Sequence, residues 1–132
     1  MVTHALVLAI QGVAFLPYTA AFVRIAGRRV NALTHVLVVC GLALDALLGV
    51  TASLFSDLGG NRQGAPWDNP LFVSHVVLAG VGMFGFLGLL LLLVLRRQPW
   101  SERFAARAVW VVFPCWAAGV VIAMANVLFR FY

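Results

Sequence analysis

Four long apolar segments alternate with short polar segments along the chain. They cover about residues 5–23, 32–55, 71–95 and 108–129. Each is close to the roughly 20 residues that an α-helix needs to cross the hydrocarbon core of a bilayer. Because lipid offers the backbone no hydrogen-bond partners, each segment is expected to be helical. The pattern predicts an all-α fold, a polytopic membrane four-helix bundle that forms one transmembrane domain over residues 1–132.

The composition supports a membrane protein and gives little support to an enzyme. Hydrophobic residues make up 64% of the chain and charged residues 10%, whereas a soluble domain is roughly 25% charged. Such high hydrophobicity is the opposite of the composition that keeps a chain disordered. The sequence holds no GxSxG, HExxH or CxxC motif, so hydrolytic or transferase chemistry is weakly supported. The expected partners are the lipid bilayer and other membrane protein subunits.

The arginines divide unevenly between the segments that connect the apolar stretches. The first and third connections hold seven of the nine basic residues, namely Arg24, Arg28, Arg29, Arg96, Arg97, Arg103 and Arg107. The second connection holds Arg62, and the C-terminal end holds Arg130. Since basic residues stay on the cytoplasmic side, both termini and an outer loop over residues 56–70 are expected to face outward from the bacterial inner (plasma) membrane. The net charge of +5 is then a topology signal, and nucleic acid is not an expected partner.

A short self-similarity relates the two halves of the chain. Residues 2–9 resemble residues 73–79, and both contain a histidine that follows a Ser or Thr at the start of an apolar segment. The similarity is compatible with two related helical hairpins, an arrangement known from membrane-protein repeats. It places His4 and His75 at similar depth near the outer face, and His35 at the cytoplasmic start of the second span.

Three polar residues in the first apolar segment share one helical face. His4, Gln11 and Tyr18 repeat every seven residues, a spacing that aligns side chains along a helix. This stripe is expected to face the bundle interior. Its functional interpretation is a contact to a ligand, a quinone or a proton. Its structural interpretation is hydrogen bonding between helices, which stabilises a membrane bundle by about 0.6 kcal/mol per bond.

The second apolar segment carries a carboxylic acid in a line of small residues. Gly41, Asp45 and Gly49 are four residues apart, so the glycines allow another helix to approach the acid closely. An ionisable residue inside a span is costly and needs a reason. Two hypotheses remain open for Asp45, a proton relay or a neutral acid that is hydrogen-bonded to a neighbouring helix.

The third apolar segment places a histidine above small residues. His75, Ala79, Gly82 and Phe86 share one helical face. The small side chains leave room beside the imidazole. Either a flat group such as a porphyrin or simply another helix is expected to fill that room.

Two histidines at one depth on two helices are the minimum for bis-imidazole heme ligation. Neutral imidazole is a good axial ligand for iron, and four-helix bundles build cofactor sites from facing side chains. The hypothesis makes His4 and His75 the metal ligands of a heme b, with Gln11, Tyr18 and Arg130 as further cofactor contacts. Copper or zinc would need a third ligand that the sequence does not make obvious. A bundle without any cofactor is the other alternative.

Several short motifs resemble the YozB-type (CtaM-like) family of small four-helix membrane proteins. The matching features are Arg28-Arg29 before a histidine-led span, residues 71–79, Arg103 to Arg107, and the last-span residues Trp110, Pro114, Trp116 and Gly119-Val120. The second apolar segment is also similar to HsmA-type membrane proteins, on the strength of His35, Gly41 and Asp45.

The first resemblance implies a role in the maturation of heme-copper oxidases, in which heme is delivered or seated and His75 and His35 are the carried-over histidines. The chain departs from that pattern, because arginines stand where a histidine is expected before the last span. His35 is then left without a partner. The leading hypothesis is a respiratory-membrane protein that binds heme or assists oxidase assembly, in the service of electron transport. The alternatives are a cofactor-free structural accessory subunit of a larger membrane complex and a proton-coupled transporter that uses Asp45.

Overall fold

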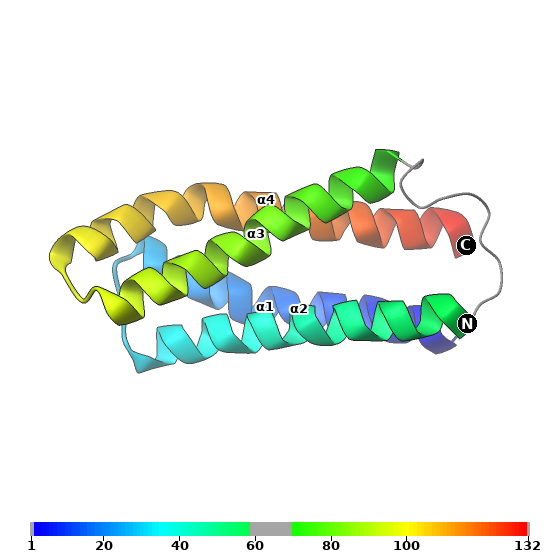
Figure 1. Cartoon of the computed structure of the whole chain (residues 1–132), viewed down its shortest axis with the longest axis horizontal. Coiled ribbons are helices and arrows are strands. Elements are labelled where there is room, and N and C mark those ends of the chain that lie inside the picture. The colour runs from blue at the N-terminus through cyan, green and yellow to red at the C-terminus, as the bar shows by residue number, and fades with distance from the viewer. Residues whose placement is uncertain (1, 59–69, 132) are drawn as a thin grey trace.

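The computed structural model is a bundle of four helices, with two short links at one of its ends (Figure 1). Helix α1 spans Val2–Ala26, α2 spans Ala32–Leu58, α3 spans Pro70–Leu95 and α4 spans Pro99–Phe131. The structure describes residues 2–58 and 70–131, and it describes the side chains of these residues except those of 2–4, 52–58, 127 and 129–131. All regular secondary structure within these two ranges is α-helical.

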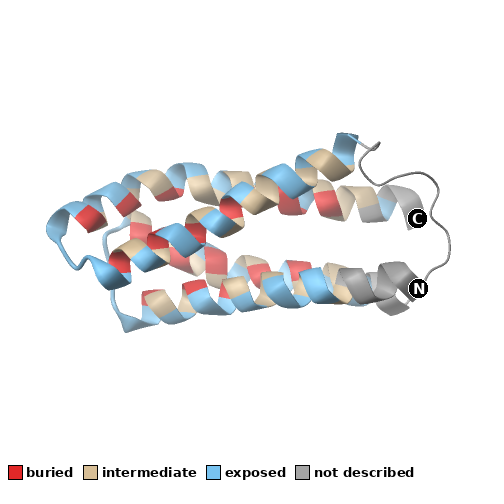
Figure 2. Cartoon of the chain, in the orientation of Figure 1, coloured by how far each residue is buried: buried red, intermediate tan, exposed pale blue. Residues whose placement is uncertain are grey.

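Each helix contains a stretch that is long and apolar enough to cross a membrane. The four stretches are Ala5–Ala26, Ala32–Thr51, Pro70–Leu95 and Pro99–Asn126. Large apolar side chains such as Leu16, Phe84 and Leu95 are exposed on the outward faces of the helices, while the buried residues face inward (Figure 2). Such an apolar exterior is suited to lipid. The predicted all-α membrane bundle is therefore confirmed.

All four helices extend beyond the predicted apolar segments. Helix α2 continues to Leu58, into the region where an outer loop was expected, and α4 begins at Pro99 instead of near residue 108. Arg103 and Arg107 thus lie on a helix and not in a link. Hydropathy ends a segment at its first charges, but arginine is a good helix former and both side chains are exposed. Residues 59–69 of the predicted outer loop lie outside the described residues.

The helices occupy the four corners of the bundle. Helices α3 and α4 pack most closely, α1 packs against both α2 and α4, and α2 touches α3 least among the adjacent pairs. The pairs α1–α3 and α2–α4 are therefore the diagonals. The closest approach joins α3 to α4, where a Cβ added to Gly82 would lie 2.2 Å from the Cβ of Trp116. Glycine is needed at this position because no larger residue leaves room for α4.

A network of side chains fixes the link between α1 and α2. The Oδ1 atom of Asn31 accepts a hydrogen bond from the backbone N–H of Thr34 over 3.2 Å, and Thr34 Oγ1 accepts one from the backbone N–H of Asn31 over 3.4 Å. This reciprocal pair caps the start of α2. Arg24 adds hydrogen bonds to Thr34 Oγ1 (3.1 Å) and Asn31 Oδ1 (2.9 Å). Arg28, with φ of 57°, turns the chain just after α1. The link thereby sets α1 and α2 side by side.

Candidate functional site

The carboxylate of Asp45 is the centre of a polar cluster built by three helices. Tyr18 on α1 donates its hydroxyl hydrogen to Asp45 Oδ2 over 2.7 Å, and Trp116 on α4 donates its indole N–H to the same oxygen over 3.0 Å. Both donor residues are fully buried. An acid inside an apolar bundle needs such donors, because an unpaired polar group costs free energy there. We term Tyr18, Asp45 and Trp116 the Asp45 cluster.

Aromatic rings enclose the Asp45 cluster. The ring of Tyr18 lies 4.3 Å from that of Trp116 and 4.5 Å from that of Phe86, measured between centroids. Gly41 makes this position possible, because a Cβ there would lie 2.7 Å from the Tyr18 ring. The ring thus rests against α2 at Gly41, and its hydroxyl reaches Asp45 one turn later. Gly41 and Gly49 were both predicted to let another helix approach Asp45 closely. A Cβ at Gly49 would meet nothing within 4 Å, so the close approach occurs at Gly41 and not at Gly49.

His75 on α3 is anchored to the backbone of the neighbouring helix α4. Its Nδ1 atom lies 2.8 Å from the carbonyl oxygen of Gly119 on α4. In the tautomer that donates this hydrogen bond, Nε2 carries a lone pair that is available to a ligand. The side chain is half-buried, and its orientation is set by α4.

Helix α4 fills the small-residue face below His75. A Cβ added to Gly119 would lie 2.5 Å from the backbone nitrogen of Ala79, and one added to Gly82 would lie 2.2 Å from the Cβ of Trp116. At these separations the two backbones are in direct contact, and a porphyrin does not fit between α3 and α4 at this level. The sequence left either a porphyrin or another helix to fill this face, and in the structure another helix fills it.

The structure brings only part of the predicted cofactor set together. Tyr18 meets Asp45, and Gln11 is buried with 7% of its surface exposed, as a stripe that faces the interior requires. The Oε1 atom of Gln11 is buried and has no hydrogen-bond partner. The side chains of His4 and Arg130 lie outside the described residues. Of the two predicted metal ligands, only His75 is thus described.

The remaining histidine lies at the other end of the bundle. His35 stands in the first turn of α2, beside the two short links, and its Nε2 atom is buried without a partner. Cys40 and Cys115 are free thiols. Among the residues whose side chains the structure describes, no three His, Cys, Asp or Glu side chains gather in a way that could hold a metal ion.

Trp116 is the residue of the Asp45 cluster that the sequence did not reveal as a partner of the acid. A signal was nevertheless present. Trp116 lies in the middle of an apolar span, far from the interfaces where tryptophans usually act as anchors. A buried indole N–H usually finds an acceptor, and Asp45 is the acid at membrane depth that could provide one.

A scan against models of known protein families, a search of curated proteins and a search of solved structures find no match. The resemblance to the YozB-type and HsmA-type families therefore stays a hypothesis, and the site is interpreted from the residues of this chain.

Proposed function

We propose that this chain is a structural accessory subunit of a larger complex in the bacterial plasma membrane, with its two arginine-rich links in the cytoplasm. The observation that supports this proposal best is the joint donation of Tyr18 and Trp116 to Asp45. These two bonds use the interior carboxylate to join α1, α2 and α4. The polar groups around Asp45 are then accounted for by holding the bundle together.

The outward surface is consistent with such a role. Each helix exposes large apolar side chains, for example Leu16 on α1, Val39 on α2, Phe84 on α3 and Val111 on α4. These faces suit lipid and equally suit the helices of another membrane subunit, because both environments are apolar. A partner complex would therefore be met by the outer faces of the bundle.

Blue-native electrophoresis of membranes solubilised in a mild detergent tests the proposal. We expect the tagged chain to migrate with a complex much larger than its own mass. A small four-span membrane protein that carries the same tag serves as the control for detergent-induced association. Migration of the chain as a free monomer in every mild detergent would contradict the proposal.

We propose heme binding as a second candidate function, on the basis of the bond between His75 Nδ1 and Gly119 O. A backbone carbonyl that holds one ring nitrogen is the usual way in which a ligating histidine is oriented. Bound iron would supply electron-transfer chemistry, and His75 would hold it through Nε2. The donor suits this role, but the face on which a slot was expected is filled by α4. The candidate is therefore the weaker of the two.

Two variants, His75→Gln and His35→Gln, separate this candidate from nonspecific heme uptake. In each, glutamine replaces a histidine of similar size. If heme binds at His75, the parent chain shows a saturable absorption band near the Soret wavelength. His75→Gln then loses this band, and His35→Gln keeps it. Equal absorption in both variants would exclude His75 as a ligand.

A further inference from the structure

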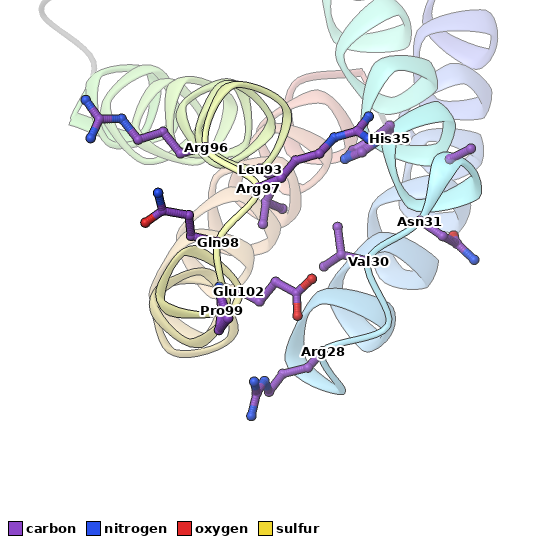
Figure 3. Close-up of a pocket in the computed structure, with 11 residues that line it drawn as sticks. Arg28, Val30, Asn31, His35, Leu93, Arg96, Arg97, Gln98, Pro99 and Glu102 are labelled. Carbon is purple, nitrogen blue, oxygen red and sulfur yellow. The ribbon is translucent and has the colours of Figure 1, made fainter.

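A cavity of about 680 Å³ opens at the end of the bundle where the two short links lie (Figure 3). Its walls come from the α1–α2 link with the start of α2, and from the end of α3 with the start of α4. Helices α2 and α3 touch least among the adjacent pairs, so the cavity lies where the bundle is least filled. We term it the arginine pocket.

Three arginines line the arginine pocket together with a single acid. The arginines are Arg28, Arg96 and Arg97, and the acid is Glu102. None of the three guanidinium groups makes a hydrogen bond or an ion pair with a described residue. Figure 3 shows Arg97 extending across the pocket toward α2, while Arg28 and Arg96 extend outward from its rim. Unpaired guanidinium groups around a cavity favour an anion, which each of them can bind through two N–H donors.

A buried nitrogen without a partner lies in the same wall. His35 lines the pocket, and its Nε2 atom is buried and makes no hydrogen bond. A buried ring nitrogen that lacks a partner is unusual in a folded protein. An anion oxygen seated between Arg97 and His35 would accept a hydrogen bond from this nitrogen.

The depth of the arginine pocket matches that of lipid headgroups. The apolar stretch of α2 starts at Ala32 and that of α3 ends at Leu95, so the pocket lies at the boundary between the hydrocarbon core and water. Val30 and Leu93 contribute apolar wall beside the arginines. Basic pockets between membrane helices at this level bind the headgroups of anionic lipids.

We propose that the arginine pocket binds a phosphate group, and that its depth favours the phosphodiester of an anionic lipid over free phosphate. The phosphate lies between Arg97 and His35, with Arg28 and Arg96 available from the rim. Glu102 opposes binding, because its carboxylate faces the same cavity and repels the anion. The site differs from the Asp45 cluster in place and in chemistry, and the proposal does not depend on the accessory-subunit function.

Native mass spectrometry of the full chain in detergent tests the proposal, with phosphatidylglycerol and phosphatidylcholine as titrants. We expect Arg97→Gln to weaken the binding of phosphatidylglycerol about tenfold, the effect of losing one charge-assisted contact. Arg103→Gln is the matched control, because Arg103 lies one turn along α4, is exposed and does not line the pocket. Glu102→Gln should tighten binding severalfold, a gain that a misfolded variant would not produce.

The outcomes separate the possible sources of the phosphate. Displacement of the lipid by millimolar inorganic phosphate from the parent chain, but not from Arg97→Gln, would support a phosphate site open to the free ion. Lipid binding that resists inorganic phosphate would support a site for the lipid headgroup. An equal loss in Arg97→Gln and Arg103→Gln, together with no gain in Glu102→Gln, would overturn the proposal and leave only general surface charge.

Discussion

Trp116 on α4 and Asp45 on α2 share a hydrogen bond of 3.0 Å across a diagonal of the bundle. The backbones of α2 and α4 make no close contact along their described residues, so the long indole side chain makes the connection. Tyr18 meets the same carboxylate oxygen from α1. One acid in α2 therefore holds two other helices in register.

Replacing Asp45 by Ala should strongly destabilise the bundle, because it leaves the donors of Tyr18 and Trp116 buried without an acceptor. Hydrogen bonds between membrane helices contribute about 0.6 to 1.7 kcal/mol each, so the loss of two should cost about 1 to 3 kcal/mol. Asp45→Asn keeps one acceptor oxygen and should cost less. The free energy of unfolding in mixed micelles measures both effects. Val50→Ala, on the exposed face of α2, is the control, and an Asp45→Ala variant as stable as this control would contradict the assigned role.

Tyr18→Phe removes a hydroxyl and keeps the ring that packs on Gly41 and Phe86. In a double-mutant cycle with Asp45→Ala, we expect a coupling energy of about 0.5 to 1.7 kcal/mol, since the two side chains share one hydrogen bond. Unfolding of the parent, the two single variants and the double variant under one set of conditions measures it. Strict additivity would show that the bond makes no net contribution to stability.

Gly82→Ala tests the close packing that fills the face below His75. The added methyl would meet the Cβ of Trp116, so α3 and α4 must move apart, at a cost of about 1 to 3 kcal/mol. Gly88→Ala on the same helix is the control, because a Cβ there meets nothing within 4 Å. That variant should be neutral or stabilised by up to about 1 kcal/mol, since alanine favours helix. Similar melting temperatures for the two variants would be inconsistent with direct contact between the helices.

Thr34→Val should loosen the link between α1 and α2. The substitution keeps the buried volume and removes the hydroxyl that Arg24 and Asn31 contact, for an expected cost of about 1 to 2 kcal/mol. Hydrogen exchange of the amides in residues 27–34 should become faster. Thr19→Val, at an exposed position of α1, should leave this exchange unchanged, and unchanged exchange in both variants would count against the network.

The four spans could be predicted from the sequence because the thickness of a bilayer fixes the length of an apolar segment. The start of α4 at Pro99 could not, because hydropathy stops at Arg103 and Arg107 whereas helical hydrogen bonding continues through them. The burial of Gln11 and Tyr18 followed from their seven-residue spacing.

The partners of the interior polar residues were not predictable in the same way. Helical periodicity shows which residues share a face, but not which helix that face meets. The pairing of Asp45 with Trp116 and that of His75 with the carbonyl of Gly119 depend on the order of helices around the bundle. The small-residue face below His75 left two options open for this reason, and only the position of α4 decided between them.

Heme titration of the purified full chain, followed by absorption spectroscopy, tests the central claim, that the interior polar residues serve to hold helices together, against the second candidate function, in which His75 holds heme. We expect no saturable band near the Soret wavelength at one heme per chain, because α4 occupies the face beside His75. A saturable band at that ratio, abolished by His75→Gln, would contradict the claim.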